Sequence, residues 1–284
     1  MNVLAVDIGG TKVTLAVFED GKMILRETHA TDRDGGREWM LEKVISVAKN
    51  WGARLQFDRC GIGFGGPVNY AKQRVDKSTH VGGWNDFDFP GFIQSELGVP
   101  AIIDNDANVG ALGEYSFGAG AHADPMFYIT LSTGIGGGII INGSLFRGAD
   151  SFAGEIGHIT IRPDGPECLC GARGCLERMC SGLWLERDYG KPPKELLQDH
   201  RFVQKYVVDL ALGLKSAILF LNPARIVVGG GISKAGKKLI DPLKAELRQQ
   251  ITSWSASRID VVTACLADDS VLYGALALVD ELEK

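Results

Sequence analysis

The sequence predicts an α/β protein made of two α/β domains. Apolar segments rich in valine and isoleucine alternate with segments of helical period along most of the chain. A pattern of apolar strand, glycine turn and apolar strand occurs near the N-terminus and again at 126–146. The length of 284 residues suits one large domain or, more commonly, two of ordinary size. The repeated pattern favours two related halves.

The first half is predicted to begin with strands and to continue with alternating helices and strands. The turns GGT and EDGK separate the first three strands, which are rich in valine, isoleucine and leucine. A helix is predicted at 37–50, where apolar residues recur every three or four positions. A second helix of small residues begins within NDANVGALGEY. The predicted strands are 3–8, 12–18, 23–28, 59–64 and 99–104.

The second half begins with the segment MFYITLSTGIGGGIIINGSLF, which predicts three strands joined by a glycine turn and a short turn. A long helix is predicted at 201–222, ended by Asn222-Pro223 because the residue before a proline disfavours helical geometry.

The end of the chain predicts two more strands and a final helix. The strands are RIVVGG (225–230) and IDVVTA (259–264), and the helical region between them is expected to break near Pro242. The final helix is expected to start near Asp269 or Ser270. Its apolar face is expected to carry Leu272, Leu276, Val279 and Leu282.

Composition narrows the class of protein. Hydrophobic residues make up 45% and charged residues 23%, as in a soluble globular protein. The net charge is −5, whereas a general nucleic-acid-binding protein carries an excess of basic residues. No apolar run approaches the ~18 residues of a membrane span, and the N-terminus, with Asp7, lacks the basic start of a signal peptide. We therefore expect a cytoplasmic protein without nucleic-acid or membrane partners. Structural disulfides are rare in the cytoplasm.

Three of the six cysteines fall within one short loop. Cys168, Cys170 and Cys175 lie in CLCGARGC, and His158 ends the preceding motif GEIGH. Three thiolates and one imidazole form a tetrahedral set that is typical of structural zinc. Because one residue separates Cys168 from Cys170, the spacing differs from that of common zinc fingers. Spacing alone favours zinc, while a redox role and free thiols stay open.

Five blocks occur in an order that resembles the ROK family of sugar kinases and repressors. They are LAVDIGGTK, DNDANVGALGE, LSTGIGGGI, GEIGH with CLCGARGCLERMCSG, and IVVGGGIS, and they cover essentially the whole chain. The resemblance implies an actin-like ATPase (ribonuclease H-like) fold with two α/β domains around a cleft. It places one domain at 1–107, completed by a C-terminal helix at about 270–284. The larger domain, at 108–269, would hold the zinc loop and the adenosine motif.

The resemblance implies an ATP-dependent kinase that phosphorylates the 6-hydroxyl of a hexose, with glucose expected. Asp106 would be the base that accepts the proton of that hydroxyl. From the residues alone, Asn105-Asp106 is better explained as a helix N-cap, and the two roles are compatible. The alternatives are a kinase of N-acetylmannosamine or N-acetylglucosamine and, from another class, a sugar-sensing transcriptional regulator. A regulator needs a DNA-binding domain before the first strand, which is predicted to begin at Val3.

The family's sugar contacts map onto residues from both predicted domains. Without the resemblance, the glutamates among them are equally explained as solvated surface residues. The implied sugar contacts are Gly65, Gly66, Asn105, Asp106, Glu155, His158 and Glu177. By the same resemblance, zinc would be held by His158, Cys168, Cys170 and Cys175, and the protein would be a homodimer active in carbohydrate metabolism.

The nucleotide contacts map onto three glycine turns. DIGGTK is not a Walker P-loop, because GxxxxGK[ST] is absent, but its backbone N–H groups can approach phosphate. Asp7 could orient Mg²⁺ through water. Taken alone, the two later blocks are better explained as structural turns. The implied ATP contacts are Gly9, Gly10, Thr11 and Lys12, then Thr133 and Gly134, and at the adenosine Gly229, Gly230 and Gly231.

Overall fold

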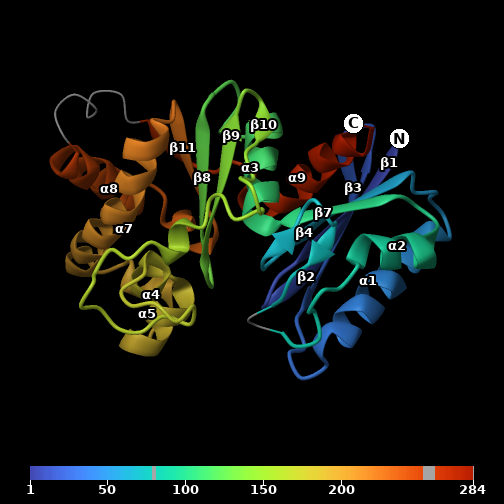
Figure 1. The fold of residues 1–284 in the computed structure, drawn as a ribbon, viewed down its shortest axis with the longest axis horizontal. Helices are drawn as coiled ribbons and strands as arrows, with labels where there is room; N and C mark the ends of the chain where they lie inside the picture. The colour runs from blue at the N-terminus through green and yellow to red at the C-terminus, as the bar shows by residue number, and fades with distance from the viewer. Residues whose placement is uncertain (79–80, 252–259, 284) are drawn as a thin grey trace. The chain divides into compact units, whose positions relative to one another are not determined.

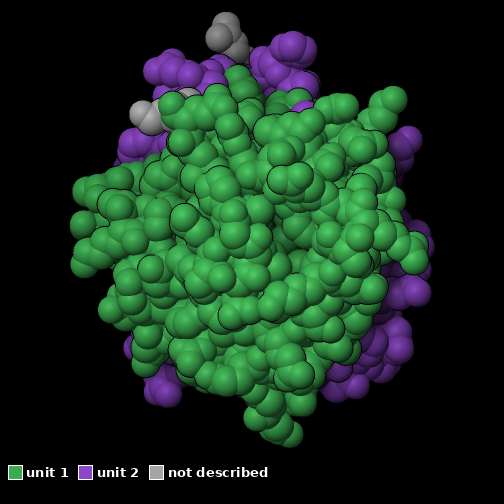
Figure 2. Space-filling model, turned by 90° about the vertical axis from the view of Figure 1, so that its right-hand side faces the viewer, with its two compact units in different colours: residues 1–116, 147–152, 269–284 green, residues 117–146, 153–268 purple. Residues whose placement is uncertain are grey.

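The computed structural model describes residues 1–78, 81–251 and 260–283, which form two compact units (Figure 1). Unit 1 is assembled from three separate segments of the chain, and Figure 2 shows its atoms in green. Its segments are Met1–Ser116, Arg147–Phe152 and Asp269–Lys284. Unit 2 consists of Phe117–Phe146 and Ala153–Asp268.

Unit 1 contains a five-stranded sheet in the order β3-β2-β1-β4-β7. The first three strands are antiparallel neighbours, whereas β1, β4 and β7 run parallel to one another. These three strands are buried almost throughout, as expected for parallel strands covered on both faces. The strands are β1 (Asn2–Ile8), β2 (Lys12–Glu19), β3 (Lys22–Ala30), β4 (Arg59–Phe64) and β7 (Ala101–Asn105).

Helices cover both faces of this sheet. Alternate residues of β4 point to opposite faces, so Ile62 joins the core under α1 and α2, whereas Gly61 and Gly63 contact α9. Figure 1 shows α1 and α2 together beside the strands. The helices are α1 (Gly36–Gly52), α2 (Phe89–Leu97), α3 (Asp106–Phe117) and α9 (Ser270–Leu278), with the short hairpin β5 (Val68–Asn69) and β6 (Arg74–Val75).

Unit 2 repeats the strand order of unit 1. Its sheet runs β10-β9-β8-β11-β12, again with an antiparallel hairpin followed by three parallel strands. The strands are β8 (Met126–Leu131), β9 (Ile135–Ile141), β10 (Ser144–Leu145), β11 (Arg225–Gly229) and β12 (Val261–Thr263). The helices are α4 (Leu176–Cys180), α5 (Gly182–Tyr189), α6 (Pro193–Leu196), α7 (His200–Leu221) and α8 (Lys237–Gln250), with 3₁₀ turns η1 (Ile156–His158) and η2 (Gly231–Ala235).

The predicted α/β class is confirmed, and three details differ. The helix predicted to break near Pro242 is continuous, because α8 buries Leu239 and Leu243 on one face and this packing outweighs the hydrogen bond that proline removes. Leu282, predicted on a buried face, is 37% exposed, since α9 gives way to a 3₁₀ turn at Val279. The strand predicted at 259–264 is observed only as β12, and Ile259 lies outside the described residues.

None of the helices in the described part of the chain is both long enough and apolar enough to cross a membrane.

Glycines allow α3 and α9 to pack backbone against backbone within unit 1. A Cβ atom at Gly274 would lie 1.7 Å from the carbonyl oxygen of Val109, and one at Gly113 would lie 2.1 Å from that of Ser270. Neither oxygen can move away without displacing a helix backbone. The crossing of the two helices therefore requires glycine at both positions.

We expect Gly274→Ala to lower the free energy of unfolding by about 3 kcal/mol, because the added methyl group must separate α3 from α9. Chemical unfolding measures the loss. Gly82→Ala is the matched control, since a Cβ atom there meets nothing within 4 Å and the change should stay within about 0.5 kcal/mol. Equal stability of the two variants would contradict the close contact.

Candidate functional site

Three parallel strands of unit 1 end at the same edge of the sheet. In the strand register, Ile8 of β1 pairs with Phe64 of β4, and Phe64 pairs with Asn105 of β7. The segments that follow these residues therefore leave the sheet side by side. The carboxyl ends of parallel strands are where α/β proteins bind ligands.

Asn105 and Asp106 have different positions at this edge. Asn105 ends β7 and caps α3, because its Oδ1 accepts a hydrogen bond of 2.9 Å from the amide of Ala107. Its Nδ2 donates to the carbonyl oxygen of Gly66 and, at 3.2 Å, to Oδ1 of Asp106. Asp106 is the first residue of α3. The capping role therefore falls to Asn105, and Asp106 follows it in the first turn of the helix.

Gly65 brings Asp106 close to the turn between β1 and β2. The amide of Gly65 donates a 2.7 Å hydrogen bond to the carbonyl oxygen of Ile8. A Cβ atom on Gly65 would lie 3.4 Å from Cα of Gly9 and 3.5 Å from Oδ2 of Asp106. The carboxylate of Asp106, the loop at Gly65 and the glycine turn at Gly9 are thus neighbours within unit 1.

The β1–β2 turn is held in shape by hydrogen bonds to its carbonyl oxygens. Thr31 Oγ1 donates to the carbonyl oxygen of Gly9 at 3.0 Å, and Arg33 Nε donates to that of Gly10 at 3.1 Å. These two hydrogen bonds fix the orientation of the carbonyl groups of Gly9 and Gly10. Thr11 and Lys12 lead from the turn into β2, and Asp7, which is buried at 7% exposure, precedes it in β1.

The β8–β9 turn of unit 2 carries Thr133 and Gly134 and is fixed by the junction between α4 and α5. The amides of Gly182 and Leu183 donate to the carbonyl oxygens of Ser132 and Thr133 at 2.8 and 3.1 Å. This turn occupies the same place in its sheet as the β1–β2 turn does in unit 1.

Glu177 of α4 also contacts this turn, which the sequence did not predict. Its Oε2 accepts a 2.8 Å hydrogen bond from the amide of Ile135, the first residue of β9. A Cβ atom on Gly134 would lie 2.7 Å from the same oxygen. One predicted sugar contact is therefore bound directly to a predicted phosphate turn.

Glu155 lies close to His158 and Glu177 in unit 2. Its Oε2 is 3.8 Å from Nε2 of His158. The pKa of Glu155 is raised, mainly because the carboxyl group is partly buried. The proximity of His158 lowers this pKa, and the proximity of Glu177 raises it. Glu155, His158 and Glu177 thus form one polar group within unit 2.

Close packing requires glycine at two of the three positions predicted to contact the adenosine. A Cβ atom on Gly229 would lie 2.3 Å from the hydroxyl of Tyr128, and one on Gly230, whose φ is +81°, would lie 2.4 Å from the carbonyl oxygen of Leu131. A Cβ atom on Gly231 would meet nothing within 4 Å. Of these three glycines, Gly231 alone has space beside its backbone, at the start of η2.

The predicted zinc ligands come together in unit 2. Among the described residues, one ligand atom each of His158, Cys168, Cys170 and Cys175 lies within 4.8 Å of all the others. The Sγ atoms of Cys170 and Cys175 are 3.6 Å apart, close to the sulfur–sulfur separation around a tetrahedral ion with bonds of ~2.3 Å. This donor set fits zinc.

Two of the three thiols in this cluster are poor thiolates without a cation, whereas for Cys170 burial is outweighed by hydrogen bonds from the backbone of Ala172 and from the neighbouring cysteines, which lower the pKa. Burial raises the pKa of Cys168, and it raises the pKa of Cys175 to about 12. Near pH 7 these two thiols therefore hold their protons, which a bound metal ion would displace.

Comparison with known proteins places these features in a family. The model of the ROK family matches residues 3–282. A glucokinase of Thermotoga maritima is 30% identical to the chain, with 99% of this chain and 98% of that protein covered. An N-acetylmannosamine kinase of Haemophilus influenzae is 29% identical, with 97% and 94% covered.

A solved structure of similar fold is a ROK family glucokinase from Streptomyces griseus in complex with glucose and AMPPNP. The TM-score is 0.86 at 29% identity, with 98% of this chain and 99% of that chain covered. The predicted actin-like ATPase (ribonuclease H-like) fold is confirmed by this similarity.

We expect Glu177→Ala to cost about 1.5–3 kcal/mol of stability, because the amide of Ile135 loses a charged acceptor. Glu177→Gln keeps a carbonyl oxygen at the same place and should cost less than half as much. Chemical unfolding and the hydrogen-exchange rate of the Ile135 amide measure the two variants. An unchanged exchange rate in Glu177→Ala would show that the bond is absent in solution.

Proposed function

The chain belongs to the ROK family, and from that premise we propose that it is an ATP-dependent hexose kinase, with glucose as the expected substrate. It would transfer the γ-phosphate of ATP to the 6-hydroxyl of the sugar. The observation that carries the proposal is the position of Asp106, whose carboxylate lies beside Gly65 and the glycine turn at Gly9. A base next to a phosphate-binding turn is the arrangement that phosphoryl transfer to an alcohol requires.

Asp106 is the proposed base that orients the 6-hydroxyl and accepts its proton. In a loose phosphoryl-transfer transition state the hydroxyl loses its proton late, so its orientation matters more than the strength of the base. Asn105 supports this role, because its side chain caps α3 and donates to Asp106. Most of the rate would come from holding hydroxyl and phosphate in line.

Both glycine turns are proposed to bind phosphate oxygens through backbone N–H groups. Their carbonyl groups are already engaged, which leaves the turns rigid before ATP binds. When bound, Mg²⁺ neutralises charge on the phosphates, and Asp7 is the proposed group that orients it through water. The proposed ATP contacts are Gly9, Gly10, Thr11, Lys12, Thr133 and Gly134, with Gly229, Gly230 and Gly231 at the adenosine.

Sugar binding is proposed to use polar side chains and two glycines. Vicinal hydroxyls are recognised by carboxylates and amides that accept and donate in pairs. The proposed sugar contacts are Gly65, Gly66, Asn105, Asp106, Glu155, His158 and Glu177. Cytoplasmic location and a homodimer stay predictions.

Zinc is proposed to hold the loop that precedes α4. The four ligands, His158, Cys168, Cys170 and Cys175, fill a tetrahedral ion and leave no open position for catalysis. The ion would fix one ring nitrogen of His158, so the other could donate to a sugar hydroxyl. Because Cys175 is the N-cap of α4, the same ion would fix the helix that carries Glu177.

An N-acetylhexosamine kinase is the second candidate. It is supported by the relative from Haemophilus influenzae, an N-acetylmannosamine kinase of almost the same identity as the glucokinases. The chemistry at Asp106 would be the same, and the difference would lie in the group accepted at the 2-position of the sugar. A sugar-sensing regulator is the third candidate, and its expected property is sugar binding without phosphorylation.

A coupled assay with ATP and a panel of glucose, mannose, N-acetylglucosamine and N-acetylmannosamine tests the proposal. We expect ADP release that depends on sugar, fastest with glucose. Release with an N-acetylated sugar alone would favour the second candidate. Sugar binding by calorimetry without any ADP release would contradict the kinase proposal.

Asp106→Asn is the catalytic control in this assay. The amide keeps the shape of the side chain and cannot accept the proton, so turnover should fall by about 10²–10⁴-fold while sugar binding stays measurable. Turnover like that of the unaltered protein would refute Asp106 as the base.

Elemental analysis of the purified protein is expected to find about one zinc per chain, because the cluster offers one complete ligand set. Removal of the ion with a chelator should lower the melting temperature, and Cys170→Ser should do the same. Cys265→Ser is the control, since that exposed cysteine lies outside the cluster. A metal-free protein with full stability and activity would contradict the structural role.

A further inference from the structure

One short segment joins unit 1 although the chain on either side of it belongs to unit 2. Arg147–Phe152 follows the strands β8 to β10 and precedes the segment that contains Glu155 and His158. Two residues of this segment, Ser151 and Arg147, bind to the rest of unit 1. Ser151 accepts a hydrogen bond of 3.1 Å from the amide of Tyr70, and Arg147 makes the larger set of contacts.

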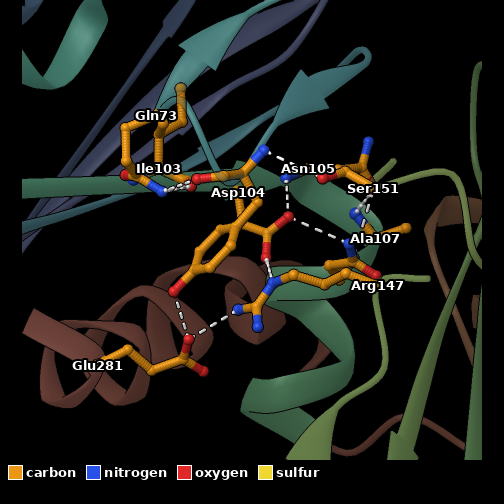
Figure 3. A network of polar contacts seen from close by, with 10 residues as sticks. Gln73, Ile103, Asp104, Asn105, Ala107, Arg147, Ser151 and Glu281 are labelled. Carbon is orange, nitrogen blue, oxygen red and sulfur yellow. Dashed lines mark hydrogen bonds and ion pairs between the residues drawn. The ribbon is translucent and has the colours of Figure 1, made fainter. Parts of the chain in front are cut away.

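Arg147 links three side chains that are far apart in the sequence (Figure 3). Its Nε donates to Oδ2 of Asp104 at 2.6 Å, and its Nη2 donates to Oε2 of Glu281 at 3.0 Å. The guanidinium also lies over the ring of Tyr70, with Cζ 3.6 Å from the ring centre, and the hydroxyl of Tyr70 donates to Glu281. Planar arginine can make all these contacts at once, which lysine cannot.

Asp104 connects this network to the candidate catalytic residues. Its side chain is only 1% exposed. The other carboxylate oxygen, Oδ1, accepts 2.7 Å and 3.1 Å hydrogen bonds from the amide of Asn105 and the side chain of Asn108. Arg147 therefore binds a carboxylate that in turn holds the backbone of Asn105, one residue before Asp106.

The buried carboxylate of Asp104 depends on the positive charge of Arg147. Burial raises the pKa of Asp104, and Arg147 is the main group that lowers it again. Burial also raises the pKa of Tyr70, with a further contribution from its hydrogen bond to Glu281. Without the guanidinium, a buried carboxylate and the carboxylate of Glu281 would lose their cation.

We propose that Arg147 is a positioning residue that holds the end of β7, and through it Asn105 and Asp106, in the geometry required for phosphoryl transfer. The inference rests on the proposed kinase function. The contacts run from the guanidinium to Asp104, from Asp104 to the Asn105 amide, and from the Asn105 side chain to Asp106. Among the described residues, the hydrogen bonds and the ring contact of Arg147 go to Asp104, Glu281 and Tyr70, none of which is assigned to sugar or ATP.

The test compares Arg147→Gln, Arg147→Lys and the double variant Asp104→Asn/Arg147→Gln in the coupled assay. We expect Arg147→Gln to lower kcat/KM for the sugar by about 100-fold, through both kcat and KM, because small displacements of reacting groups have effects of this size. The KM for ATP should stay within about twofold. A loss of folded protein alone would lower the apparent kcat and leave the KM for the sugar unchanged.

The other two variants test the path through Asp104. Arg147→Lys keeps a charge for Asp104 and should recover part of kcat/KM. In the double variant the carboxylate at position 104 that would lack its cation is gone, although Glu281 still lacks the guanidinium, and Asn can still accept from the Asn105 amide. We therefore expect it to exceed Arg147→Gln by at least about fivefold, the coupling expected of residues in direct contact.

Arg59→Gln is the matched control. Arg59 lies at the opposite end of β4 and binds the same C-terminal turn, through Glu283 and the carbonyl oxygen of Val279. This variant loses an arginine–carboxylate pair and should keep both KM values. If Arg147→Gln, folded by circular dichroism, has the kcat/KM of Arg59→Gln, the inference is wrong. If the unaltered protein phosphorylates none of the sugars, the proposed function fails instead.

Discussion

The parallel register of β1, β4 and β7 is the constraint on which the candidate site of unit 1 depends. It aligns Ile8, Phe64 and Asn105, so that a glycine turn, a glycine loop and the start of a helix leave the sheet together. Backbone hydrogen bonds enforce this alignment, and burial on both faces prevents a shift, since a slip by one residue would reverse every side chain. The sheet brings Asp106 near the turn, and the hydrogen bonds of Asn105 and Asp104 fix the end of β7 from which Asp106 follows.

In unit 2 the corresponding glycine turn is held by helices rather than by the strand register alone. This turn is fixed by α4 and α5, and Glu177 adds a carboxylate to the amide of Ile135. The position of α4 depends in turn on the loop with the three cysteines, whose thiols are close enough for one ion, and burial raises the pKa of two of them, Cys168 and Cys175. The proposed metal site and the glycine turn are therefore connected through α4.

Local patterns in the sequence predicted the features that are local in the chain. The strands, the glycine turns, the pair Asn105-Asp106 and the cysteine loop each lie within a few consecutive residues, and the family resemblance connected them. The ligand cluster of His158 with the three cysteines assembles as expected. The α8 helix was mispredicted at Pro242 because the burial of its apolar face depends on tertiary packing.

The contacts of Arg147 could not have been predicted in this way. Asp104, Glu281 and Tyr70 come from distant parts of the chain, and arginine, carboxylate and tyrosine are too common to mark a network by type. The same holds for Glu177, whose bond to the Ile135 amide involves a backbone group that has no sequence signature. Such contacts appear only when the chain is folded.

The crossing of α3 and α9 has a further consequence for protein engineering. A poor fit between two side chains can be repaired by trimming either one, so most core positions have partners that can compensate. At Gly274 and Gly113 the opposing atoms are main-chain oxygens, which no substitution at Val109 or Ser270 can remove. Combinatorial libraries built on this scaffold should keep both glycines invariant, whatever diversity is introduced around them.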